Sequence, residues 1–165
     1  MALFVMTGAG LAAGGSAVAQ EHAGSHHAKM DHAAMTPDAA QLVVYKTANC
    51  GCCGNWAEHM KSAGFDVKVH QVSDEELSAI KQAKGVTRDL ASCHTAEIGG
   101  YTVEGHVPAS DLKTLLSERP EGIVGIAVPG MPMGSPGMEN PDQPADSYDV
   151  LTFTASGETA VFVSH

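Results

Sequence analysis

Four cysteines dominate the chemistry available to this sequence. Three lie in one short motif, Cys50-Gly51-Cys52-Cys53, and the fourth is Cys93. Cys50 and Cys53 have the Cys-x-x-Cys spacing, and the motif lies between a predicted strand and a predicted helix. Backbone N–H groups and the helix dipole at such a position lower the pKa of a thiol. Because a thiolate is both the nucleophile of disulfide exchange and a ligand for soft metals, the motif suits either chemistry.

The third thiol of the motif distinguishes the two chemistries. A plain dithiol oxidoreductase needs only Cys50 and Cys53, and Cys52 would offer a competing disulfide partner. A single tetrahedral zinc is also disfavoured, since structural zinc sites usually space their paired cysteines by two or more residues. Crowded thiolates suit copper(I), which is soft and readily bridged by thiolate. The motif therefore predicts Cu(I) binding, with a multinuclear copper–thiolate cluster as one form.

Hydrophobic patterning, helix caps and Gly or Pro stops predict the elements that position these residues. The predicted order is a strand at 42–45, a helix at 52–62, a strand at 67–69, a helix at 74–84, strands at 95–98 and 101–107 joined by Gly99-Gly100, and a helix around Leu112–Leu116. This β-α-β-α-β-β-α order, with cysteines after the first strand, is that of a thioredoxin-like α/β fold. The charged residues of the 74–84 helix are assigned to a solvated face.

The remaining third of the chain differs in composition. An apolar run at 123–128 precedes a Gly/Pro/Met loop at 129–144. Residues 148–154 and 159–163 then predict a closing β-hairpin across Ser156-Gly157. We expect this loop and hairpin to be additions to the thioredoxin-like core.

Cys93 precedes the predicted strand at 95–98. In thioredoxin-like folds the loop entering this strand faces the Cys-x-x-Cys turn and usually carries a cis-proline, whose place Cys93 takes here. The distant thiol is therefore expected close to the other three, which makes Cys50, Cys52, Cys53 and Cys93 the predicted metal ligands. Two structural disulfides, or disulfides in an oxidised form and copper in a reduced form, remain as alternatives.

The N-terminal segment predicts export. Residues 1–19 are apolar and rich in small residues, have no charge, and end in Ala17-Val18-Ala19, which resembles a signal-peptide cleavage site. A short membrane anchor is the alternative. Residues 20–40 predict a disordered linker rich in His and Met, suited to loose copper scavenging. The folded copper-binding domain is then 41–165, with no membrane contact after signal cleavage.

The charge balance argues against a nucleic-acid partner. The chain has 9 Lys and Arg against 19 Asp and Glu, a formal net charge of -10, and its basic residues are scattered. An acidic chain suits a cation better than a phosphate.

Several further residues are candidate auxiliary copper ligands. They are His94, His106, Met131, Met133 and Met138. Imidazole and thioether both suit copper, and the Gly/Pro/Met loop is expected to form a lid beside the thiolates. Glu104 and His106 are two residues apart and are expected to share a strand face, where the carboxylate can orient the imidazole. Gap-filling methionines and a purely structural Glu–His pair are the alternatives.

Five motifs in this order resemble one family. They are Cys50-Gly51-Cys52-Cys53 with Trp56, Ser92-Cys93-His94-Thr95, Glu104-Gly105-His106-Val107-Pro108, Pro129-Gly130-Met131-Pro132, and Gly134-Ser135-Pro136-Gly137-Met138. The set resembles the CopG-like copper-resistance proteins, long catalogued as a domain of unknown function. The resemblance implies a periplasmic, thioredoxin-like protein of copper homeostasis whose four cysteines bind copper and take part in its redox chemistry. Copper ions, and periplasmic copper carriers or exporters, are the implied partners.

Two other function classes stay open from the sequence. The first is a thiol–disulfide oxidoreductase without a metal role, with Cys50 and Cys53 as its catalytic pair. The second is a zinc- or disulfide-stabilised interaction module. A copper/thiol oxidoreductase would combine the copper site with catalysis.

Overall fold

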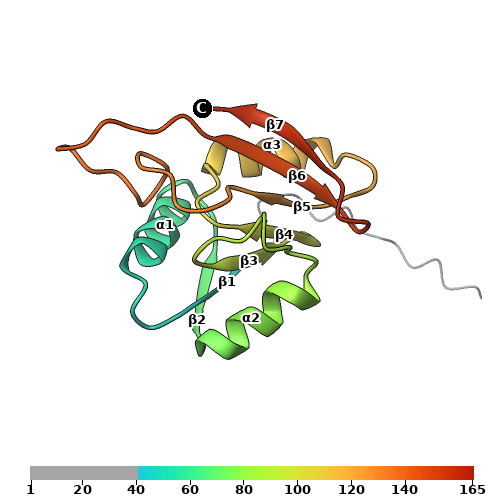
Figure 1. Cartoon of the computed structure of the whole chain (residues 1–165), viewed down its shortest axis with the longest axis horizontal. Coiled ribbons are helices and arrows are strands. Elements are labelled where there is room, and N and C mark those ends of the chain that lie inside the picture. The colour runs from blue at the N-terminus through green and yellow to red at the C-terminus, as the bar shows by residue number, and fades with distance from the viewer. Residues whose placement is uncertain (1–40) are drawn as a thin grey trace, which may run out of the picture. The chain divides into compact units, whose positions relative to one another are not determined.

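The computed structural model describes residues 41–165 as a mixed α/β fold in which three helices pack on a seven-stranded sheet (Figure 1). The first seven elements and the closing hairpin follow the predicted order, and the apolar run at 123–128, for which no strand is predicted, forms a further strand. The elements are β1 (Leu42–Lys46), α1 (Gly51–Ser62), β2 (Val67–Gln71), α2 (Asp74–Ala83), β3 (Thr95–Ile98), β4 (Tyr101–Glu104), α3 (Ala109–Glu118), β5 (Ile123–Ala127), β6 (Asp149–Thr154) and β7 (Thr159–Ser164). The predicted C-terminal hairpin is confirmed as β6 and β7.

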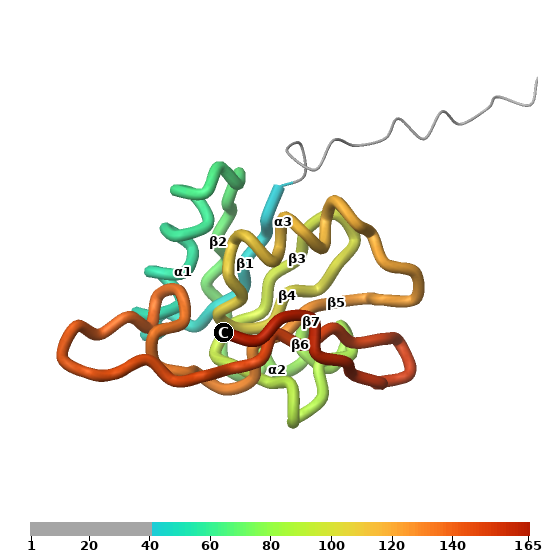
Figure 2. Tube along the Cα trace, turned by 90° about the horizontal axis from the view of Figure 1, so that it is seen from above, coloured from blue at the N-terminus to red at the C-terminus, as the bar shows by residue number. Residues whose placement is uncertain are grey.

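The strand order across the sheet is β2-β1-β3-β4-β5-β6-β7. Two neighbouring pairs are parallel, β1 with β2 and β4 with β5, and each is joined by a helix, as parallel pairing requires. The other four pairs are antiparallel. Figure 2 shows α1 and α3 on one side of the strands and α2 on the other.

The main core lies between the sheet and the face shared by α1 and α3. Trp56 and Met60 of α1 are fully buried in one cluster with Leu112 and Leu115 of α3, which confirms the predicted core face of the first helix. The Trp56 indole Nε1 donates a hydrogen bond of 2.9 Å to the carbonyl oxygen of Val107. This bond ties α1, and so the cysteine motif at its start, to the segment that follows β4.

One predicted strand is too long. The strand predicted to run to Val107 ends at Glu104, because Gly105 turns the chain with φ 72°. The Gly105 N–H donates to the carbonyl of His94 at 3.1 Å. A Cβ at Gly105 would lie 2.5 Å from the Val128 carbonyl oxygen, so only glycine fits this turn. Residues before and after Gly105 therefore do not alternate as they would in a strand.

Two predicted segments lie outside the described residues. They are the signal peptide at 1–19 and the His/Met linker at 20–40. Within 41–165, none of the helices combines the length and apolarity needed to cross a bilayer.

Gly125 of β5 lies where the Phe153 ring of the neighbouring strand β6 leaves no room for a side chain. A Cβ there would overlap the Phe153 ring and lie 2.6 Å from the Thr102 carbonyl oxygen. Gly125→Ala should therefore lower the free energy of unfolding by about 1–3 kcal/mol, the usual cost of overpacking. Urea denaturation measures this loss. Gly54→Ala in α1 is the matched control, since a Cβ there meets nothing within 4 Å. Equal stability of the two variants would contradict the packing.

Candidate metal centre

Four sulfur atoms meet at the start of α1. Cys50 is the N-cap of the helix, and Cys52 and Cys53 lie in its first turn. The sulfurs of Cys50, Cys52, Cys53 and Cys93 all lie within 4.8 Å of one another. Cys50 and Cys53 form a disulfide, the Cys50 sulfur lies 3.5 Å from that of Cys52, and the Cys53 sulfur lies 3.3 Å from that of Cys93. Cys52 and Cys93 are free thiols in this form.

Strand pairing explains how Cys93 reaches the motif. β1 and β3 are antiparallel, and Tyr45 near the end of β1 pairs with Thr95 at the start of β3. The chain after β1 and the chain before β3 therefore leave the sheet at the same edge, and each carries cysteines. The expected approach of Cys93 to the helix start is found, and residues 41–165 contain no cis peptide bond.

Two buried imidazoles face the Cys93 sulfur. His106 Nε2 lies 3.0 Å from it and His94 Nδ1 lies 3.4 Å from it. His106 Nδ1 lies 2.8 Å from the carbonyl oxygen of Pro136. Since that oxygen can only accept, Nδ1 carries the proton and the lone pair of Nε2 faces the sulfur. Cys93, His94 and His106 thus form a second group of potential ligands that shares one sulfur with the first.

His94 is the more enclosed of the two rings. It packs against the indole of Trp56 with ring centroids 4.4 Å apart. Burial, and secondarily the neighbouring His106, holds the pKa of His94 well below its usual range. Its Nε2 is buried without a hydrogen-bond partner in residues 41–165. The ring is therefore neutral, which is the form that binds a metal.

The expected pairing of Glu104 with His106 is wrong. The turn at Gly105 sends the two side chains to different partners. The Glu104 carboxylate accepts hydrogen bonds from Lys81 Nζ at 2.5 Å, the Ser92 N–H at 2.6 Å and Thr95 Oγ1 at 2.7 Å. The bond from Lys81 also corrects the assignment of the charged residues of the 74–84 helix to a solvated face, because the Lys81 side chain is only 15% exposed. The glycine between Glu104 and His106 was the signal that alternation breaks here.

The Gly/Pro/Met loop packs on the start of α1. A Cβ at Gly137 would lie 2.8 Å from the carbonyl oxygen of Cys52 and 2.7 Å from the backbone nitrogen of Trp56. The loop backbone therefore lies directly against the helix that carries the cysteines. Within the loop, Met131 is 53% exposed, and Met133 and Met138 are half-buried. The loop thus lies against the start of the helix that carries the cysteines, and its role as a lid stays a prediction.

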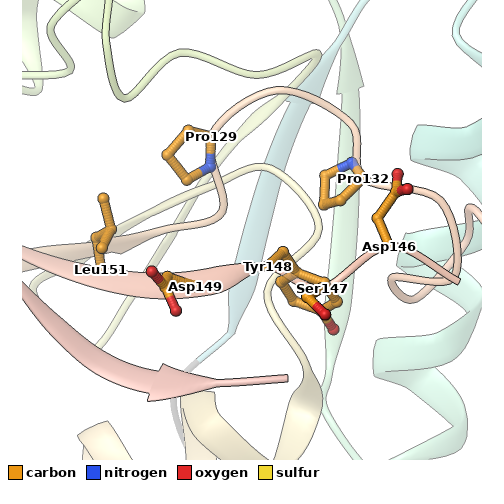
Figure 3. A pocket seen from close by; sticks show the side chains of 7 residues that line it. All are labelled: Pro129, Pro132, Asp146, Ser147, Tyr148, Asp149 and Leu151. Carbon is orange, nitrogen blue, oxygen red and sulfur yellow. The ribbon is translucent and has the colours of Figure 1, made fainter.

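A hollow of about 520 Å³ is lined in part by this loop (Figure 3). Its lining residues are Pro129, Pro132, Asp146, Ser147, Tyr148, Asp149 and Leu151. None of them belongs to either ligand group. The candidate metal centre is therefore the sulfur and imidazole cluster, and this hollow is not part of it.

Comparison with known proteins places this centre in a family. Residues 90–138 match the family model described as "Protein of unknown function, DUF411". Two solved structures of a copper resistance protein, CopG, forms 1 and 2, are 45% and 44% identical to this chain. Each has a TM-score of 0.69 and covers 76% of this chain, and the matches span 96% and 98% of those chains. This chain belongs to the CopG family of copper-resistance proteins. The predicted resemblance is thereby confirmed.

The match to the DUF411 model covers only part of the centre in this CopG-family chain. It includes Cys93, His94, His106 and the methionines of the loop, whereas the three-cysteine motif at Cys50–Cys53 lies outside it. The comparison with curated proteins finds no match. The two CopG structures, which match over 76% of this chain, therefore carry the family relationship over a longer part of it.

The reactivity of Cys93 should depend on pH in an unusual way. Burial, with a contribution from Cys52, raises the pKa of Cys93 to about 12. At pH values well below 12 the folded protein holds Cys93 as the thiol, whereas an ordinary thiol with a pKa of about 8.5 is already half ionised at pH 8.5. The alkylation rate of Cys93 by iodoacetamide, followed by peptide mass spectrometry, should still be rising at pH 10. A midpoint near pH 8.5 and a plateau by about pH 10 in the folded protein, like those expected of the urea-unfolded chain, would contradict this.

The contact of the loop with α1 can be tested at Gly137. Gly137→Ala should lift the loop from the helix, because its Cβ would meet backbone atoms of Cys52 and Trp56. We expect amide hydrogen exchange of residues 132–138 to accelerate at least tenfold. Gly130→Ala is the matched control: it lies in the same loop with φ 69°, but a Cβ there meets nothing within 4 Å. The same acceleration in both variants would show that backbone strain, not the contact, is responsible.

Proposed function

We propose that this CopG-family protein is a periplasmic copper-binding protein of copper resistance that binds Cu(I) through Cys50, Cys52, Cys53 and Cys93. The convergence of four sulfurs within 4.8 Å, from segments 40 residues apart, carries the proposal. The copper-resistance function of the two related structures supports copper as the metal. The predicted signal peptide supports the location, and copper carriers or exporters are the proposed exchange partners.

The donor set suits copper(I) better than zinc. Cys52 and Cys53 are adjacent in sequence, and thiolates this crowded bridge soft ions more readily than they enclose one tetrahedral zinc. A bridged cluster of several copper ions follows from the same argument. His94 and His106 are the proposed auxiliary ligands on the buried side, because their ring nitrogens lie near the Cys93 sulfur. Met131, Met133 and Met138 are the proposed auxiliary ligands of the loop.

Copper redox chemistry is the finer part of the proposal. The first seven elements have the order of a thioredoxin-like fold, and the Cys50–Cys53 disulfide forms at the start of its first helix. The two thiols can reduce two Cu(II) ions to two Cu(I) ions, with formation of that disulfide and release of two protons. Cys52 and Cys93 remain as thiols that can hold Cu(I).

The Cys50–Cys53 disulfide also favours a second candidate function. A thiol–disulfide oxidoreductase without a metal role would use this pair alone. Its turnover of a disulfide substrate would survive the loss of Cys52, whereas the copper site would not.

Copper(I) titration tests the proposal. The full chain is reduced without oxygen and titrated with Cu(I) against a coloured competing chelator, and free thiols are counted before and after. We expect more than one copper per chain, protection of all four thiols, and loss of tight binding in Cys52→Ser, because a bridging thiolate is removed. His70→Ala is the control, a histidine stacked on Tyr45 and outside both ligand groups.

Two results would contradict the copper site. One is that the reduced chain does not compete with the chelator while its thiols remain free to form the Cys50–Cys53 disulfide. The other is that Cys52→Ser binds as tightly as the parent. The first result would make the dithiol oxidoreductase the better account.

A further inference from the structure

Glu104 is a buried carboxylate that the proposed copper site does not use. It ends β4, and its side chain is fully enclosed. Both of its oxygens are engaged: Oε1 accepts from the Ser92 N–H and from Lys81 Nζ, and Oε2 accepts from Thr95 Oγ1. A carboxylate without such partners would be expensive to bury, so the surrounding donors are matched to it.

Two of these donors flank the Cys93-His94 dipeptide. Ser92 immediately precedes it and Thr95 immediately follows it, so one carboxylate holds both ends of the segment that carries the distant sulfur. Gly105, the residue after Glu104, makes a third hydrogen bond to this segment: its N–H donates to the carbonyl oxygen of His94 at 3.1 Å. The end of β4 thus holds the segment along its whole length.

Lys81 completes this arrangement from α2. Its ammonium lies 2.5 Å from Glu104 Oε1 and 3.0 Å from Thr95 Oγ1, so it binds both the carboxylate and one of its donors. Hydrogen bonds with a charged partner are about twice as strong as neutral ones. The ion pair therefore fixes the carboxylate from the helix side, while the carboxylate fixes the cysteine segment.

We propose that Glu104 is a positioning residue, which sets the place of the Cys93 sulfur by holding Ser92 and Thr95. Cys93 is the only member of the sulfur cluster that comes from outside the Cys50–Cys53 motif, and its sulfur lies 3.3 Å from that of Cys53. A displacement of about 1 Å can change the rate of a positioned reaction by about a hundredfold. The geometry stands without a metal, while its consequence for copper rests on the function proposed above.

The effective concentration of the Cys93 thiol relative to the Cys53 thiol, obtained from the equilibrium for disulfide formation between them, measures this positioning directly. In a full-length Cys50→Ser, Cys52→Ser background, Cys53 and Cys93 are the remaining thiols. Equilibration with reduced and oxidised glutathione converts the pair to a disulfide, with two reduced glutathiones formed for each oxidised one consumed. Glu104→Gln should lower the effective concentration at least tenfold, because an amide nitrogen cannot accept the hydrogen bonds that one carboxylate oxygen accepts.

Glu97→Gln is the matched control. Glu97 of β3 forms a 2.5 Å ion pair with Lys84, the C-cap residue of α2. This pair also joins the helix to a strand, one turn away, but Glu97 makes no bond to Ser92 or Thr95. We expect its effective concentration to equal that of the background. Thr95→Val tests the same hold if Glu104→Gln does not fold, and it should give a smaller decrease of about twofold to fivefold, since one of the two flanking bonds is lost.

An effective concentration in folded Glu104→Gln equal to that of the Glu97→Gln control would overturn the proposal. So would an equal decrease in both variants, since that would reflect the loss of any α2 ion pair. A copper(I) titration of Glu104→Gln in the otherwise natural chain should leave Cys93 unprotected while copper still binds to the motif. If the natural chain binds no copper, the proposed function fails while the glutathione comparison still decides the role of Glu104.

Discussion

The antiparallel pairing of β1 with β3 is the constraint on which the sulfur cluster depends. It places the end of β1 opposite the start of β3, with Tyr45 paired to Thr95. The chain continues from one strand into the three-cysteine motif and enters the other from Cys93, so the two cysteine segments must meet. The hydrogen bond from the Trp56 indole to the Val107 carbonyl oxygen then fixes the position of α1 relative to the segment that follows β4. Sheet register and helix docking together bring the sulfurs together before any metal arrives.

Burial determines the chemical state of this cluster. Cys93 is held as a neutral thiol because burial raises its pKa to about 12, and burial lowers the pKa of both His94 and His106. The enclosed ligands are therefore uncharged at neutral pH. A soft cation bound by Cys93 would have to displace its thiol proton, so one proton would leave that sulfur as the metal binds. Because burial keeps the proton on Cys93, a metal has to compete with that proton, and its binding would become tighter as the pH rises.

Gly105 separates two kinds of polar chemistry that the sequence places two residues apart. On one side of this turn, the Glu104 carboxylate accepts hydrogen bonds from Lys81, Ser92 and Thr95. These bonds join α2 to the segment that carries Cys93. On the other side, His106 is directed to the Cys93 sulfur and to the Pro136 carbonyl of the loop. The turn is possible because no Cβ obstructs the approach of the Val128 carbonyl. The turn at Gly105 thereby directs Glu104 to the residues that flank Cys93-His94 and directs His106 to the candidate metal centre.

The sequence by itself determined the order of the first seven elements, the core face of Trp56 and Met60, the closing hairpin and the convergence of Cys93 on the motif, because local periodicity and chain order carry that information. It misplaced the end of β4, paired Glu104 with His106 and left Lys81 in solvent. Those outcomes depend on contacts between segments far apart in sequence: Gly105 against Val128, and Lys81 of α2 against Glu104. Tertiary structure alone decided them, since a side chain's partner is set by the strand register and by which helix covers that face of the sheet.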